Sequence, residues 1–105
     1  MRELHHIGIP TTEVKPNEVY MADAKLYITE IDDSPNKVEW LRFEEGSPMP
    51  ELLRRSPHIA YVVPSIEQAM AGQEVLLPPF SPKEGMTCGF IIEEGLPIEV
   101  IELAD

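Results

Sequence analysis

The chain has 105 residues, which is enough for one domain with a modest core. Acidic residues outnumber basic residues by 19 to 8, so the formal net charge is −11 at pH 7. This balance excludes a basic surface for nucleic acid and disfavours contact with an anionic membrane. The expected partner is therefore a small molecule, either a substrate or a ligand.

The compartment is indicated by what the sequence lacks. Cys88 is the only cysteine, so an intrachain disulfide is impossible, as is usual for proteins of a reducing compartment. The first residues lack the apolar run of a signal peptide, and no stretch approaches the roughly 20 apolar residues of a membrane span. We expect a soluble, cytoplasmic protein.

The first half of the chain reads as short strands separated by turn residues. Apolar or alternating runs predict four strands, near residues 3–9, 18–22, 24–31 and 37–44. The DDSPN segment before the fourth strand predicts a turn, because Pro fixes φ and Asp, Ser and Asn hydrogen-bond locally. Residues 50–55 are expected to form one helical turn.

The second half adds the only sizeable helix that the sequence predicts. A strand is expected near 57–63, followed by a helix near 66–71 that begins at the N-cap Ser65 and ends at Gly72. A short strand near 74–77 leads into an expected loop at 78–85, PPFSPKEG. The last two strands, residues 86–94 and 96–103, are expected to form a hairpin.

An internal repeat relates the two halves. Three segments of the first half resemble three of the second half in the same order: 5–10 and 57–64, 26–32 and 89–95, 37–43 and 97–103. The matches place a His and a Glu at equivalent positions in each half. The alternative is chance, because strands rich in Ile and Val often resemble one another.

Four side chains of these segments are candidate metal ligands: His6, Glu39, His58 and Glu99. Strand side chains alternate between faces, so each of the four shares a face with small or apolar residues of its own strand. A carboxylate in such a setting is costly unless it is paired or bound to a cation. Two imidazoles and two carboxylates suit a divalent ion of zinc, nickel, cobalt, manganese or iron.

Each of these residues also has a plainer interpretation. A single His in a strand is more often structural than a ligand, and a Glu in a final strand often faces solvent. His5 is expected to face away from His6 and to be structural. Glu30 and Glu93 form a second matched pair, and we expect them to be solvated near hairpin ends.

The motifs resemble the glyoxalase and bleomycin-resistance group, the vicinal-oxygen-chelate superfamily. LHHIGIP, VEW, HIAYVV and IEVIEL resemble, in order, the four segments that carry that family's metal ligands. The resemblance covers nearly the whole chain. It implies an α+β fold in one domain, residues 1–105, with two βαβββ-like modules at about 1–46 and 57–105.

The resemblance also implies a function. The set His6, Glu39, His58 and Glu99 is similar to that of the glyoxalase I and methylmalonyl-CoA epimerase branches, in which a metal-bound carbonyl is polarised and a neighbouring proton is removed. Glu99 is the first choice for the base and Glu39 the second. The alternative is a non-catalytic binding protein of the bleomycin-resistance type, or a structural domain with vestigial His and Glu.

The sequence departs from the family pattern in its first module. Only TTEVKPNE, residues 11–18, stands where a helix is expected, and Pro16 interrupts it. The first module is therefore expected to lack most of its helix. The sheet face left uncovered, with Ile7, Ile9, Val38 or Trp40, predicts a homodimer, in which the site lies within one chain or between two.

Overall fold

Short β-branched and apolar runs form the strands of the computed structural model, which describes residues 2–104. Met1 and Asp105, the outer bounds of the expected domain, lie outside the described residues. The strands are β1 (Glu3–Pro10), β2 (Val19–Met21), β3 (Leu26–Ile28), β4 (Val38–Phe43), β5 (His58–Val62), β6 (Val75–Lys83), β7 (Met86–Glu93) and β8 (Leu96–Leu103). The helices are α1 (Glu51–Arg55) and α2 (Ile66–Met70), with 3₁₀ turns η1 (Ala22–Ala24) and η2 (Ile31–Asp33).

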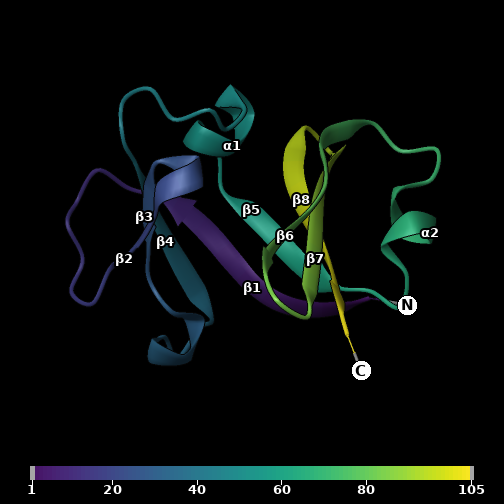
Figure 1. The fold of residues 1–105 in the computed structure, drawn as a ribbon, viewed down its shortest axis with the longest axis horizontal. Coiled ribbons are helices and arrows are strands. Elements are labelled where there is room, and N and C mark those ends of the chain that lie inside the picture. Colours follow the sequence, from purple (N-terminus) through teal and green to yellow (C-terminus); the bar gives the residue numbers. More distant parts are fainter. Residues whose placement is uncertain (1, 105) are drawn as a thin grey trace.

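The eight strands form one curled mixed sheet in the order β2-β3-β4-β1-β5-β8-β7-β6 (Figure 1). β1 and β5 are antiparallel and run through the middle of the molecule. β4 lies parallel to β1 on one side, and β8 lies parallel to β5 on the other. Four strands that are distant in the sequence, β4, β1, β5 and β8, therefore lie next to one another at the centre of the sheet.

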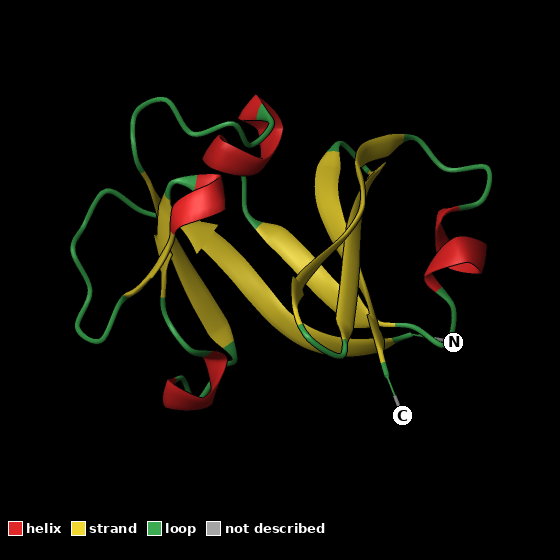
Figure 2. Cartoon of the chain, viewed as in Figure 1, coloured by secondary structure: helices red, strands yellow, loops and turns green. Residues whose placement is uncertain are grey.

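The expected α+β fold with two βαβββ-like modules is wrong. Strands account for 49% of the described residues and helices, with the 3₁₀ turns included, for 16%. The strands form one continuous sheet, and each of the two α-helices in the described residues has five residues (Figure 2). The physical reason is the frequency of breakers: Pro16 interrupts residues 11–18, and Pro50 and Gly72 adjoin the ends of α1 and α2. Neither α-helix of the described chain is long and apolar enough to cross a membrane.

The segment expected to be a loop at residues 78–85 belongs mostly to β6. This strand carries Pro78, Pro79 and Pro82, which cannot donate to a ladder. β6 is an edge strand that pairs only with β7, and its register shifts several times along the way. An edge position tolerates prolines because one side of the strand has no ladder to complete. Exposed prolines also protect that edge from pairing with another chain.

The core beneath α2 occupies one face of β7 and β8. Ser65 is the N-cap of α2, and its side chain accepts a hydrogen bond from the Gln68 backbone N–H. The buried side chains of α2 pack on the outer side of β7 and β8, in a cluster made up of Val63, Ile66, Met70, Ile91, Ile98 and Val100. The intervening residues of β8, Glu99 and Ile101, alternate with this cluster and face the inside of the curl.

Residues 11–18 cover the outside of the other half of the sheet without forming a helix. The Lys15 ammonium lies 4.3 Å from the centre of the Trp40 ring. Glu18 accepts two hydrogen bonds from the Arg42 guanidinium, at 2.9 and 2.7 Å. Trp40 and Arg42 alternate with Glu39 and Leu41 along β4, so this cover holds the strand from the face opposite to Glu39.

Candidate metal centre

The four candidate residues come from the four central strands, and strand pairing places them in two adjacent rows. In one row, Gly8 of β1 pairs with Glu39 of β4 and with His58 of β5. In the next row, Ala60 of β5 pairs with His6 of β1 and with Glu99 of β8. Each row has a small residue at its centre. The long side chains on either side can therefore lean over that residue toward one point.

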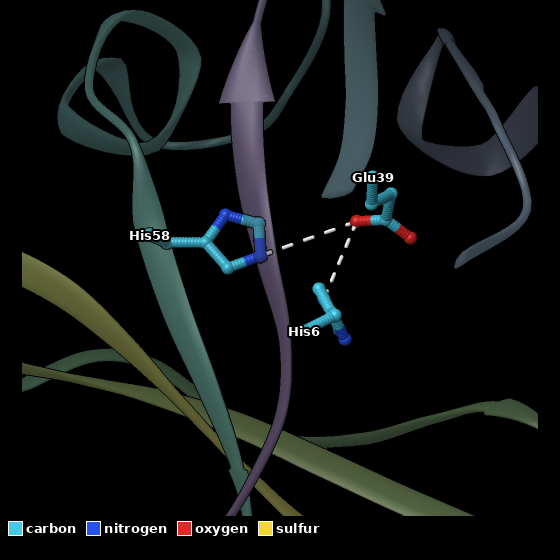
Figure 3. Close-up of side chains that lie close together, drawn as sticks. All are labelled: His6, Glu39 and His58. Carbon is cyan, nitrogen blue, oxygen red and sulfur yellow. Dashed lines mark ion pairs between the residues drawn. The ribbon is translucent and has the colours of Figure 1, made fainter. Parts of the chain in front are cut away.

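The imidazoles and carboxylates meet inside the curl. The Nε2 atom of His6 lies 3.5 Å from Oε1 of Glu39 and 3.3 Å from Oε1 of Glu99. The Nε2 atom of His58 lies 4.0 Å from the same Glu39 oxygen and 3.2 Å from the same Glu99 oxygen. His6, Glu39 and His58 each offer one possible ligand atom, and these three atoms lie within 4.8 Å of one another. Figure 3 shows the three side chains converging from separate strands.

These groups are largely buried. His58 is 1% exposed, His6 5% and Glu99 8%, and Glu39 is only partly exposed. His6 Nε2 and both ring nitrogens of His58 are buried without a hydrogen-bond partner among the described residues. A buried polar atom without a partner costs free energy, and such atoms in native proteins usually mark an ion, a water molecule or a functional site.

The charges at the site perturb each other's protonation. Burial by itself lowers the pKa of His6, yet the carboxylates of Glu39 and Glu99 outweigh it and raise this pKa to about 9. Burial also raises the pKa of Glu99, but the imidazoles of His58 and His6 outweigh it and lower this pKa to about 2. In the metal-free protein at neutral pH, a proton on His6 therefore provides the positive charge that the carboxylates require.

The distances suit a divalent ion at the centre. In a tetrahedral site with metal–ligand distances of about 2.0–2.1 Å, neighbouring ligand atoms lie roughly 3.3–3.4 Å apart. Three of the four nitrogen–oxygen distances, 3.5, 3.3 and 3.2 Å, lie close to that spacing. Imidazole nitrogens and carboxylate oxygens are also the donors that zinc and its neighbours accept. The residues present fit such an ion.

Aromatic rings form one wall beside His58. Phe90, the partner of Glu99 across β7 and β8, meets the His58 ring edge to face, with the ring centres 5.3 Å apart. Phe80 of β6 stacks on Phe90 with the ring centres 6.4 Å apart and is 37% exposed. The rings lead from the buried imidazole to the surface. Nearby, Cys88 is buried, and burial together with the Glu99 charge raises the pKa of its thiol.

His5 does not turn away from the site as the strand pattern predicts. Its Nδ1 lies 2.8 Å from Nδ1 of His6, within hydrogen-bond distance. The cause is an irregularity in β1: Leu4 pairs with Tyr61 and His6 with Ala60, so His5 is one extra residue against β5. The His-His doublet in the sequence was the only available signal for this contact.

The remaining candidates lie outside the centre. Glu30 is exposed. The carboxylate of Glu93 pairs with Arg2 at 3.0 Å. The structure thus brings together His6, Glu39, His58 and Glu99 and leaves these other acidic residues apart. Sequence reasoning assigned no role to Gly8, although its missing side chain provides the space for the His58 ring.

Comparisons with known proteins give the fold but no activity. No family model matches the chain, and no curated protein matches it. Among solved structures, the chain is similar to the crystal structure of a hypothetical protein from Bacillus halodurans C-125, with a TM-score of 0.75 and 22% sequence identity. The similarity covers 99% of this chain and 96% of that one. This curled mixed sheet is compatible with a glyoxalase-type fold.

Proposed function

We propose that the chain is a metal-dependent enzyme of the vicinal-oxygen-chelate superfamily, a glyoxalase I-like lyase or a methylmalonyl-CoA epimerase-like isomerase. His6, Glu39, His58 and Glu99 bind one divalent ion of zinc, nickel, cobalt, manganese or iron. The observation that carries the proposal is the group of buried ring nitrogens that lack a hydrogen-bond partner among the described residues and face two carboxylates. The order of the four family-like motifs supports the superfamily.

The reaction is a proton transfer at a carbon next to a carbonyl group. A divalent ion at the centre supplies a Lewis acid for the carbonyl oxygen. One of the two glutamates takes the proton as a general base. Glu99 is the first candidate because it lies between both imidazoles. Glu39 is the second, and its longer contacts with the imidazoles, 3.5 and 4.0 Å, leave it freer to move toward a substrate.

Metal analysis tests the binding step. Protein purified without chelators is expected to contain about one divalent ion per chain, as four ligands for a single ion require. His58→Ala removes a ligand, and Glu39→Gln replaces a charged oxygen ligand by a neutral one, so both should lower the metal content. Glu30→Gln is the matched control, because it removes an exposed carboxylate outside the centre and should leave the content unchanged. Wild-type protein that binds none of these ions would refute the proposal.

Isotope exchange tests the chemistry. The metal-loaded protein is incubated in heavy water with a 2-hydroxy-ketone, a hemithioacetal or an acyl-thioester, and deuterium uptake at the α-carbon is measured. Deuterium uptake above that of the same protein without metal supports an enzyme. Metal-loaded protein that binds these compounds without any uptake is instead a binding protein of the bleomycin-resistance type.

A further inference from the structure

The contact between His5 and His6 depends on a local departure from strand geometry. Adjacent residues of a regular strand point to opposite faces of the sheet. Here the extra residue in β1 tilts the His5 ring toward the site, so that the two ring centres lie 5.0 Å apart with an interplanar angle of 72°. Bulges commonly re-aim a side chain in this way next to functional sites.

One proton lies between the two rings, and its position decides what His6 can do. With 2.8 Å between the two Nδ1 atoms, one atom must donate and the other accept. If His6 donates the hydrogen bond from Nδ1, the Nε2 atom of its neutral ring carries no proton and can bind a metal ion. If His5 donates instead, the neutral His6 ring carries its proton on Nε2 and offers no lone pair to the centre.

The two imidazoles of the centre are held by different means. His6 Nδ1 has His5 as its hydrogen-bond partner. His58 Nδ1 is buried without such a partner among the described residues, and its ring is placed by packing between Gly8 and Phe90. Metal-binding histidines usually donate the other ring N–H to a carboxylate, a carbonyl or water. In the described residues, the imidazole of His5 lies within hydrogen-bond distance of the Nδ1 atom of His6, and His58 Nδ1 has no such neighbour.

We propose that His5 is a positioning residue of the metal centre, which accepts a hydrogen bond from Nδ1 of His6 and so holds the His6 ring with Nε2 directed at the ion. The inference rests on the proposed metal-binding function. It assigns His5 a role outside the set of ligands, and it requires His5 to carry its own proton on Nε2. Losing an outer partner of this kind typically lowers metal affinity by about 10–100-fold.

Two substitutions separate the effect of the hydrogen-bond acceptor at position 5 from the effect of its aromatic ring. His5→Asn places a carbonyl oxygen where Nδ1 stands, and His5→Phe keeps an aromatic ring but removes the acceptor. Zinc affinity is measured by competition with a chromophoric chelator, after circular dichroism has shown that each variant is folded. We expect His5→Asn to stay close to wild type and His5→Phe to bind zinc about 10–100-fold more weakly.

A second measurement uses wild-type protein only and needs no variant to fold. In ¹⁵N-labelled protein, a scalar coupling between the two Nδ1 atoms reports the N–H···N hydrogen bond directly, with or without zinc. If wild type binds zinc but His5→Phe binds it with unchanged affinity, this inference is overturned and the proposed function stands. The same holds if wild type binds zinc and the coupling is absent. Wild type that binds no divalent ion refutes the metal site itself, and the role of His5 with it.

Discussion

Gly8 lies opposite His58 in the β1–β5 pair, and the His58 imidazole occupies the space that a side chain at position 8 requires. A Cβ atom on Gly8 would lie 2.1 Å from Cε1 of His58 and 2.6 Å from each of its ring nitrogens. These distances are far inside van der Waals contact. Gly8 also pairs with Glu39, so its missing side chain allows two candidate ligands to meet above it.

Gly8→Ala is therefore expected to displace the His58 ring. Overpacking of this kind costs typically about 1–3 kcal/mol of stability. Zinc affinity should fall by about tenfold or more, the loss typical when a ligand is no longer oriented. Thermal unfolding measures the loss of stability, and chelator competition measures the loss of zinc affinity.

The matched control for this change is Gly72→Ala. Gly72 has φ +72°, and a Cβ there would meet no atom within 4 Å. The alanine strains the backbone by roughly 1–2 kcal/mol without touching the centre, so stability should fall while zinc affinity is retained. Equal zinc affinity in Gly8→Ala and Gly72→Ala would contradict the role assigned to Gly8.

Zinc binding should become tighter as the pH rises. The carboxylates stabilise protonated His6 in the metal-free protein, where its pKa is about 9 against an ordinary 6.5. Because this pKa is raised on folding, the contribution of protonated His6 to the stability of the metal-free protein is fully present below pH 6.5 and is lost as the pH rises past about 9. Zinc must displace that proton, because the ion binds only the unprotonated nitrogen.

Calorimetric titration with zinc at pH 7.5 in two buffers of different ionisation enthalpy measures this displacement. Wild type is expected to release about one proton for each ion bound. His6→Asn, which offers no proton to displace, should release clearly less. An affinity that does not change between pH 6.5 and pH 9 would show that His6 is not charged in the metal-free centre.

The sequence predicts much of the centre because strand periodicity decides which side chains share a face. His6 and His58 each precede a small residue of their own strand by two positions, and Glu39 and Glu99 stand in apolar strands. The convergence of these four side chains could therefore be expected. The contact from His5 could not be, because the extra residue in β1 exists only relative to its pairing with β5.

The fold class was predicted less well, and for a related reason. The prolines predict that the strand ends before residues 78–85, but an edge strand tolerates prolines, and edge position is a property of the whole sheet. The two α-helices lie close to the predicted segments 50–55 and 66–71, but each has only five residues, and one continuous sheet replaces the two βαβββ-like modules that the resemblance implied. Local breakers outweighed the implied pattern.

A homodimer remains a prediction, for reasons partly different from those in the sequence. Ile7, Ile9, Val38 and Trp40 are only partly exposed, and Lys15 covers the Trp40 ring. The more exposed apolar side chains near the β2 edge are Val14, Val19 and Tyr20, at 70%, 43% and 44% exposure. β2 is an edge strand, and an exposed edge that carries apolar side chains favours association with a second copy.

Sedimentation velocity measures this association. Wild type is expected to sediment as a dimer, and Val19→Glu, which places a charge on the β2 edge, should shift the protein toward the monomer. Glu30→Gln serves as the control for a change of charge elsewhere on the surface. A wild-type monomer even at high micromolar concentration would count against the dimer.

The two glutamates can be distinguished by what each substitution leaves behind. Glu99→Gln keeps the size of the side chain and one oxygen donor but removes the basic carboxylate. If Glu99 is the base, the variant should retain much of its metal and lose about two orders of magnitude or more in deuterium exchange at the α-carbon. Glu39→Gln should then lower metal affinity while the exchange rate per bound ion changes less. Exchange is therefore measured with every variant at full metal occupancy, checked by metal analysis of the same samples. If Glu99→Gln exchanges as fast as wild type, Glu99 is at most a ligand. The base is then Glu39, whose longer contacts with both imidazoles already leave it less tightly held.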